Sequence, residues 1–229
     1  MPEITCKLCN NSGYISEQKD IAARKFGSYC TCSIGQQEHK KGWEAKLAEM
    51  GILKDYFNIH FGNFQAQNQF PKQLMFIKDI EYYLKNITKK REEGSPWLIY
   101  GPTGTGKTLG ASLILKQAYK QGYTIKYTIW TDLIDAVFDD ELLITKLREV
   151  DFLVIDDFGR DKVAKESKFI EDLLEKIIKY RYSDKRPTIL ISSIDYTELR
   201  RRFSVIPSLI GPNSISQVDG INFRLQLKK

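Results

Sequence analysis

One short run of residues constrains the fold of this 229-residue chain more than any other. Residues 101–108 read Gly-Pro-Thr-Gly-Thr-Gly-Lys-Thr, which satisfies the pattern G-x-x-x-x-G-K-[ST] at every position. Its glycines let the backbone curl so that successive N–H groups point inward at phosphate oxygens. An apolar run precedes it at 97–100 and a helical pattern follows at 108–121, so the context favours a phosphate-binding loop over a plain glycine-rich turn.

The loop predicts a site for ATP and Mg²⁺ in which the residues have separate roles. Lys107 is expected to reach the β- and γ-phosphates, and Thr108 is expected to ligate Mg²⁺ with its hydroxyl. The positive N-terminal end of the following helix adds to the attraction for phosphate. The predicted nucleotide-binding residues of the loop are Gly101, Pro102, Thr103, Gly104, Thr105, Gly106, Lys107 and Thr108.

A phosphate loop needs an acidic partner to hold the metal, and the end of the apolar run at 152–155 supplies one. Asp156 and Asp157 follow this run directly, and ligands of open α/β sheets gather at the carboxyl ends of the strands. Asp156 is expected to hold Mg²⁺, directly or through water, and Asp157 to orient the attacking water as a general base. A polar turn at the end of the strand is the alternative for this pair.

The order of elements around the loop predicts an α/β fold. Apolar or β-branched runs at 97–100, 123–130, 152–155 and 188–192 alternate with helical patterns at 108–121, 132–150 and 165–182. Strands that alternate with helices indicate a parallel sheet with helices on both faces.

The residues before the loop predict a second, smaller part of the chain. Helical patterns are expected at 36–54 and 74–87, with an irregular aromatic linker between them and a charged break at 89–95. The aromatic side chains of the linker could stack on bases, although packing against the fold is the simpler role. The predicted division is an N-terminal domain at 1–54, a linker at 55–70 and an ATPase domain at 71–229.

All four cysteines lie in the polar segment 1–35, which lacks the apolar residues for a core of its own. The spacing is C-x₂-C at Cys6 and Cys9 and C-x-C at Cys30 and Cys32, and four thiolates from two tight turns make a tetrahedral Zn²⁺ site. Such a site would fold a segment that is otherwise too polar to fold. The alternatives are His39 as a substitute ligand, unpaired reduced thiols, or a redox pair.

Residues 57–224 resemble the AAA+ ATPases of the DnaC/DnaI helicase-loader type, a group that also includes the IstB transposition helpers. The motifs are the loop at 101–108, the acidic strand at 152–157, the strand that begins at Pro187, and the closing segment from Gly220 to Arg224. The resemblance implies a truncated helical lid, hydrolysis of ATP, and Arg224 acting as the sensor 2 group. It also implies single-stranded DNA as a ligand and a replicative ring helicase gripped by the zinc-bearing N-terminal domain.

Three departures from the family's pattern affect the predicted catalytic residues. The second acidic residue is Asp157 instead of Glu, which sets the carboxylate about 1.5 Å further from the water and predicts slow hydrolysis. Ile194 stands where the sensor 1 Asn is usual, so Ser192 or Ser193 is left as the polar group, and Ser193 joins the predicted site.

The third departure concerns the arginine finger, which the resemblance places between subunits of a homo-oligomer. Arg200, Arg201 and Arg202 follow a helix start at Asp195, but the family's second Arg is missing. The register favours Arg202 as the finger, with Arg201 second and Arg200 facing solvent or DNA. The competing functions are an IstB-like transposition helper and a slowly hydrolysing, ATP-gated adaptor.

Composition narrows the class of protein and its partners. Hydrophobic residues make up 42% and charged residues 28%, which excludes disorder as the main state. No apolar stretch approaches the roughly 18 residues of a membrane helix, and we expect no signal peptide and a cytoplasmic location. The net charge is +6, and from Lys176 onward eleven Lys and Arg face four Asp and Glu. This excess suits a polyanion such as nucleic acid or nucleotide phosphates, or is a solvated surface.

Overall fold

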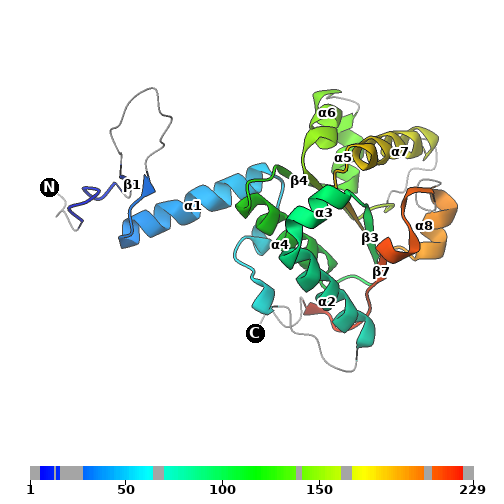
Figure 1. Ribbon diagram of the computed structural model, residues 1–229, viewed down its shortest axis with the longest axis horizontal. Helices are drawn as coiled ribbons and strands as arrows, with labels where there is room; N and C mark the ends of the chain where they lie inside the picture. The colour runs from blue at the N-terminus through cyan, green and yellow to red at the C-terminus, as the bar shows by residue number, and fades with distance from the viewer. Residues whose placement is uncertain are drawn as a thin grey trace. The chain divides into compact units, whose positions relative to one another are not determined.

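The computed structural model divides into two compact units, Met1–Glu49 and Met50–Lys229 (Figure 1). It describes residues 6–12, 14–15, 28–63, 70–137, 141–160, 167–203 and 208–223. The domain boundaries predicted from the sequence, at 54/55 and 70/71, stay predictions. Among the described residues, no helix combines the length and the apolar character that crossing a membrane requires.

The first unit is built around one antiparallel strand pair and one long helix. Strand β1 (Tyr14–Ile15) pairs antiparallel with β2 (Ser28–Tyr29), and α1 (Ser33–Glu49) follows directly. Helix α1 ends five residues before the predicted boundary at 54, because Gly51 adopts a left-handed φ of 88° just after it.

The second unit contains the predicted parallel sheet, with one strand more than predicted. The strand order is β4-β5-β6-β3-β7, and all four pairings are parallel. The strands are β3 (Trp97–Tyr100), β4 (Ile125–Ile129), β5 (Phe152–Asp156), β6 (Thr188–Ser192) and β7 (Ile215–Gln217). Strands β5 and β6 are buried at every position, as expected for the centre of a sheet with both faces covered.

Helices cover both faces of this sheet, which confirms the predicted α/β architecture. Helix α4 follows the phosphate loop and packs on β4, β5 and β6, with α2 and α3 beside it. Helices α5 to α8 contribute side chains to the core on the other face. The bounds are α2 (Pro71–Lys85), α3 (Ile87–Glu93), α4 (Lys107–Lys120), α5 (Trp130–Val137), α6 (Glu141–Glu149), α7 (Ser167–Ser183) and α8 (Tyr196–Arg202), with short 3₁₀ turns at Lys54–Tyr56, Phe61–Asn63 and Pro212–Ser214.

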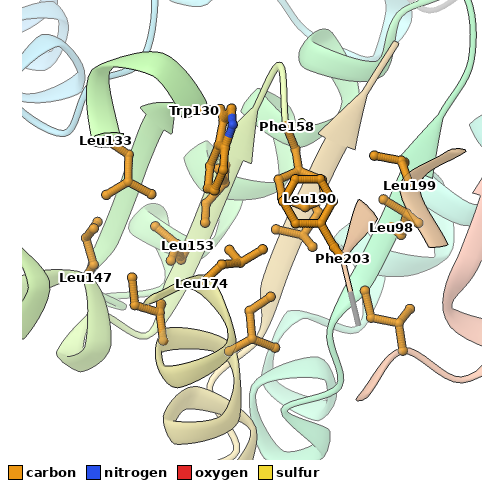
Figure 2. Packing of buried hydrophobic residues seen from close by; sticks show 14 residues of the cluster. Leu98, Trp130, Leu133, Leu147, Leu153, Phe158, Leu174, Leu190, Leu199 and Phe203 are labelled. Carbon is orange, nitrogen blue, oxygen red and sulfur yellow. The ribbon is translucent and has the colours of Figure 1, made fainter. Parts of the chain in front are cut away.

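The core on the second face combines alternate strand residues with three aromatic rings. Leu98, Leu153 and Leu190 come from three neighbouring strands and are fully buried (Figure 2). The ring of Phe158 lies 5.1 Å from that of Trp130 and 4.6 Å from that of Phe203, measured between centroids. Phe158 comes two residues after Asp156, so this aromatic group fixes the chain just beyond the predicted metal ligand.

One predicted helical segment is divided, and the prediction for a charged stretch was wrong. The pattern predicted to be helical at 132–150 forms two helices, α5 and α6, and residues 138–140 lie outside the described part. The charged stretch at 89–95 was expected to be a break, but α3 runs through most of it. Ion pairs within one helical turn, from Lys89 and Lys90 to Glu93, make this charged sequence compatible with a helix.

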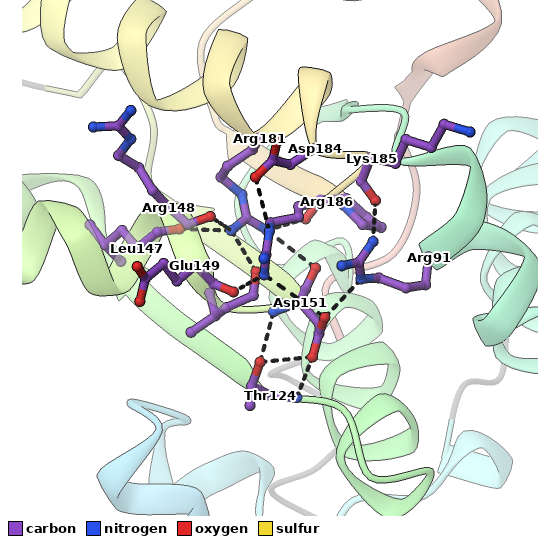
Figure 3. Close-up of polar contacts among 12 residues, drawn as sticks. Arg91, Thr124, Leu147, Arg148, Glu149, Asp151, Arg181, Asp184, Lys185 and Arg186 are labelled. Carbon is purple, nitrogen blue, oxygen red and sulfur yellow. Dashed lines mark hydrogen bonds and ion pairs between the residues drawn. The ribbon is translucent and has the colours of Figure 1, made fainter.

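A buried arginine joins several elements at the amino-terminal ends of the strands, the ends that lie away from the phosphate loop (Figure 3). Arg181, in α7, is fully buried and makes six hydrogen bonds to the starts of β5 and β6 and the end of α6. The acceptors are the hydroxyl of Thr188 and the backbone carbonyls of Leu147, Arg148, Val150, Asp151 and Pro187. This guanidinium therefore supplies hydrogen bonds to carbonyls at the starts of two strands and the end of a helix, and of these the Pro187 carbonyl also accepts from the N–H of Leu153.

Candidate functional site

The phosphate loop connects β3 to α4 in the predicted position. Gly106 is the N-cap of α4 with a φ of 96°, a left-handed conformation that glycine adopts without steric cost. Lys107 is 6% exposed, and its Nζ donates to the carbonyls of Gly101 at 2.7 Å and Pro102 at 2.6 Å. Its ammonium group thus lies inside the loop, which is where a phosphate charge would be recognised.

The two predicted metal ligands lie side by side at the carboxyl end of β5. The hydroxyl of Thr108 donates to Oδ2 of Asp156 at 2.7 Å, and the backbone N–H of Asp157 donates to Oδ1 at 2.7 Å. Asp156 is 6% exposed, so its carboxylate faces the loop instead of bulk water. A hydroxyl and a carboxylate are the hard oxygen ligands that Mg²⁺ prefers, and the donor set therefore fits this ion.

A third donor to this carboxylate was missed by the sequence analysis. The hydroxyl of Tyr127, in the neighbouring strand β4, donates to Oδ2 of Asp156 at 2.6 Å. Burial, and then the negative charge of Asp156, raise the pKa of Tyr127 well above its ordinary value, so the phenol keeps its proton. The strand predicted at 123–130 holds two tyrosines, Tyr123 and Tyr127, and nothing in the sequence marks Tyr127 as the one that reaches the site.

Asp157, the predicted general base, follows β5 in an unusual backbone conformation. Its φ is 52°, in the left-handed region that Asp tolerates better than most residues. Its side chain is exposed and lies in the same cleft as Lys107, Thr108 and Asp156. Nη1 of Arg160 lies 3.6 Å from Oδ2 of Asp157. The carboxylate is thus accessible from the cleft, as a group that acts on water requires.

One wall of the cleft comes from the segment that precedes α2. Leu53 and Tyr56 line the cleft together with residues of the phosphate loop. The buried Nζ of Lys116, in α4, donates to the carbonyls of Tyr56 at 2.8 Å and Phe57 at 3.2 Å, and also to that of Ile59. Burial, and then the charge of Lys120, lower the pKa of Lys116 to about 8. Residues 56–59 of the predicted linker are therefore anchored beside the cleft, and Phe57 is buried instead of being available for stacking on bases.

The C-terminal segment contacts the other side of the phosphate loop. The backbone N–H of Phe223 donates to the carbonyl of Gly104 at 2.9 Å, and Phe223 lines the cleft. Gln73, fully buried in α2, donates through Nε2 to the carbonyls of Thr105 at 3.3 Å and Ile221 at 3.1 Å. These contacts were not predicted, because Gln73 lies more than 140 residues from its second acceptor.

Ser192 and Ser193 are the two candidates for the polar group at the sensor 1 position, and their surroundings differ. Ser193 lines the cleft, whereas the hydroxyl of Ser192 is buried and donates to the carbonyl of Phe158 at 2.7 Å. Ser192 also accepts from the N–H of Ile194 at 3.0 Å. Of the two, Ser193 is the one that a nucleotide in the cleft could reach.

The three consecutive arginines of α8 point to different partners. Arg202 donates through Nη1 to the carbonyl of Gly159 at 2.5 Å, two residues beyond Asp157. Arg201 makes a bidentate pair with Glu198 at 2.8 and 3.0 Å on the surface, and Arg200 is exposed. Arg202 is therefore the arginine attached to the acidic end of β5. Arg224 lies outside the described residues.

The four cysteines of the first unit form one cluster. All four Sγ atoms lie within 4.8 Å of one another. Sγ of Cys6 is 3.7 Å from that of Cys30, and Sγ of Cys9 is 3.6 Å from that of Cys32. A disulfide requires about 2.05 Å, whereas a tetrahedron with Zn–S bonds of 2.3 Å has edges of about 3.8 Å. The donor set and its spacing therefore fit Zn²⁺.

The surroundings of the cysteines act in opposite directions on two of the thiols, because burial and the neighbouring cysteines raise the pKa of Cys30 to about 11. Backbone N–H groups of Cys9 and Leu8 lower the pKa of the Cys6 thiol to about 7, and Sγ of Cys32 accepts from the N–H of Gly35 at 3.4 Å. His39 lies outside the cluster, with its ring edge-on to Tyr29 at 5.1 Å between centroids.

We expect the purified protein to contain about one zinc ion per chain, because four clustered thiolates saturate the tetrahedral ion. Cys9→Ser should lose most of this metal while the second unit, which has its own core, still binds nucleotide. Metal analysis of reduced, desalted protein measures the first result. His39→Ala is the matched control and should keep its zinc. Zinc-free wild-type protein, or loss of zinc from His39→Ala, would contradict the assigned ligand set.

The parallel sheet, the phosphate loop and the paired Thr108 and Asp156 define a P-loop nucleotide-binding protein of the AAA+ fold. The model of the IstB-like ATP binding protein family matches residues 84–205, which is more than half of the chain. The chain therefore belongs to the IstB-like ATP-binding protein family.

Individual relatives carry a more specific name. The chain is 29% identical over 191 residues to the replicative helicase loader DnaC of Escherichia coli K12, covering 78% of this chain and 73% of that protein. It is 28% identical over 163 residues to DnaC of Buchnera aphidicola subsp. Baizongia pistaciae, covering 67% of this chain and 63% of that relative's length. A crystal structure of the DnaC helicase loader superimposes with a TM-score of 0.59 and 21% identity, covering 73% of this chain and all of that one.

Proposed function

We propose that this protein is an ATP-dependent loader of a replicative ring helicase in DNA replication. The observation that carries the proposal is the match to replicative helicase loaders named DnaC, which extends over 191 residues and thus beyond the 84–205 region of the family model. The retained phosphate loop and acidic strand support nucleotide dependence. The role implies a cytoplasmic location.

In the proposed site, the chain holds the triphosphate through the backbone of residues 101–106 and the charge of Lys107. Thr108 and Asp156 would hold Mg²⁺, which supplies charge neutralisation to the phosphates when bound. Asp157 then accepts the proton of the attacking water, since its carboxylate is exposed in the cleft. Ser193 is the proposed polar contact at the sensor 1 position.

Two arginines complete the proposed ATPase. We assign Arg202 as the finger that acts on the nucleotide of a neighbouring subunit in an ATP-bound homo-oligomer, and Arg224 as the sensor 2 group of its own site. The contact of Arg202 with the Gly159 carbonyl supports this choice among the three arginines, since it ties Arg202 to the loop that follows Asp157. In P-loop enzymes that use an arginine finger, this residue increases the turnover rate by a large factor.

The proposed partners divide between the two units. The zinc-bearing first unit would grip the helicase, and the basic second unit would contact single-stranded DNA. The excess of positive charge from Lys176 onward supports a polyanionic ligand.

The test combines the purified chain with the replicative helicase of the same organism and circular single-stranded DNA. We expect a stable complex with the helicase in gel filtration, and faster appearance of helicase on the circles when ATP is present. The Cys9→Ser protein should lose the helicase complex and keep nucleotide binding. A helicase that neither co-elutes with the wild-type chain nor loads faster in its presence would contradict the proposal.

Two other candidates are an IstB-like transposition helper, which the family name favours, and a slowly hydrolysing, ATP-gated adaptor, which the short carboxylate at Asp157 favours. In the same assays, the transposition helper predicts binding of a transposase in place of the helicase. Phosphate release that stays slow with single-stranded DNA present would indicate a switch.

A further inference from the structure

The carboxylate of Asp156 receives three hydrogen bonds from its own chain. Thr108 and Tyr127 both donate to Oδ2, at 2.7 and 2.6 Å, and the N–H of Asp157 donates to Oδ1 at 2.7 Å. An ionised carboxylate offers about four lone-pair positions, two on each oxygen. Oδ2 is therefore saturated by the two hydroxyls, and one position remains, on Oδ1.

Among these three donors, Tyr127 belongs neither to the phosphate loop nor to the acidic strand β5. It comes from β4, the edge strand of the sheet, where it pairs with Val154 of β5, two residues before Asp156. Its phenol therefore reaches along the strand direction to the carboxylate. The side chain is 2% exposed, so few other orientations are open to it.

The backbone of Tyr127 is held on its outer side as well. Its N–H donates to the carbonyl of Met50 at 2.8 Å, across the edge of β4. The next residue, Gly51, has a φ of 88°, and a Cβ there would meet the Tyr127 carbonyl oxygen at 2.1 Å. Only glycine permits this close approach. Tyr127 is thus fixed between the central sheet and the segment that leads to the cleft wall at Leu53 and Tyr56.

We propose that Tyr127 is a positioning residue that sets the Asp156 carboxylate for magnesium. By filling the second lone pair of Oδ2, its hydroxyl prevents rotation of the carboxylate and keeps the remaining position of Oδ1 available to the metal or its water. This inference rests on the proposed Mg²⁺–ATP site. Partners that orient metal ligands in this way typically contribute about 10- to 100-fold to metal affinity.

The proposal predicts a change in the Mg²⁺ requirement for nucleotide binding but none in nucleotide affinity without Mg²⁺. A general loss of structure would change both. Tyr127 contacts Asp156 and does not contact the phosphate loop in any of its hydrogen bonds. Removing the hydroxyl should therefore raise the Mg²⁺ concentration needed for tight nucleotide binding, whereas nucleotide affinity measured in EDTA should stay unchanged.

The experiment compares Tyr127→Phe with Tyr123→Phe in the full chain. Tyr123 precedes the same strand, packs its ring edge-on against Phe152, and has no hydrogen bond to the site, so it is a matched control. A fluorescent ATP analogue is titrated at a series of Mg²⁺ concentrations and in EDTA. We expect the half-saturating Mg²⁺ concentration to rise about 10-fold or more in Tyr127→Phe and to stay at the wild-type value in Tyr123→Phe.

Each outcome bears on one of the two proposals. Wild-type protein that binds no nucleotide would remove the proposed function itself. Wild-type binding with an unchanged Mg²⁺ requirement in Tyr127→Phe would overturn the role of the hydroxyl. Loss of nucleotide affinity in EDTA for Tyr127→Phe would also overturn it, since the hydroxyl would then support the fold and not the metal.

Discussion

Lys107→Ala should lower ATP turnover by at least about 100-fold while the protein remains folded. The ammonium group lies within the phosphate loop, and no other described lysine or arginine lines this cleft. Backbone N–H groups alone would then face the charge of the triphosphate. Phosphate release and binding of a fluorescent ATP analogue measure the two parts of this loss.

The matched control is Lys120→Ala, at the far end of the same helix. Lys120 is exposed and lies outside the cleft, so its removal changes the net charge equally without touching the loop. Circular dichroism of both variants should match the wild type. Turnover by Lys107→Ala within a factor of about three of the control would show that the loop does not serve the triphosphate.

The sheet could be predicted because its signals are local. The strands at β3, β5 and β6 are short apolar runs bounded by Pro, Gly or Asp, and the phosphate loop fixes which strand precedes a helix. Strand β7 could not be predicted in the same way. It has three half-exposed or exposed residues, and it becomes a strand only because β3 offers it an edge.

In the site, too, residues of contiguous motifs could be predicted, whereas contacts between residues distant in the sequence could not. Thr108 and Asp156 could be assigned because each belongs to a contiguous motif with a known chemical requirement. The role of Tyr127 depends on a contact with a residue 29 positions away, and that of Lys116 on carbonyls 57 to 60 positions away. Such contacts follow from the register of strands and the path of a linker, which periodicity does not specify.

Arg181 shows how a large energetic contribution can be hidden in a helical pattern. In the sequence it is one more basic residue near the end of the helix predicted at 165–182, where a charge suits the helix dipole. In the structure it is fully buried, and burial lowers its pKa to about 9, with further lowering by the nearby Arg186 and Arg91. It stays charged at neutral pH because its donors all meet oxygen acceptors (Figure 3).

We expect Arg181→Met to destabilise the second unit by about 4 kcal/mol, a large part of the 5–15 kcal/mol by which domains are stable. Methionine matches the length of the side chain but removes these donors from five backbone carbonyls, although that of Pro187 keeps the N–H of Leu153. Each buried carbonyl left unsatisfied costs about 1–3 kcal/mol before relaxation. Arg181→Lys, with at most three donors, should fall between the two. Urea denaturation followed by the fluorescence of the buried Trp97 and Trp130 measures the loss.

The exposed Arg200 provides the control, because Arg200→Met should change the free energy of unfolding by less than about 0.5 kcal/mol. A difference of this small size for Arg181→Met would mean that water or the neighbouring arginines satisfy the carbonyls instead. The expected loss of unfolding free energy in Arg181→Met would in turn locate a main source of stability at the amino-terminal ends of the strands, away from the nucleotide site. The loop that carries Asp157 and the end of α8 that carries Arg202 lie at the opposite ends of the strands, where they are free to respond to the nucleotide while β5 and β6 stay fixed at their starts.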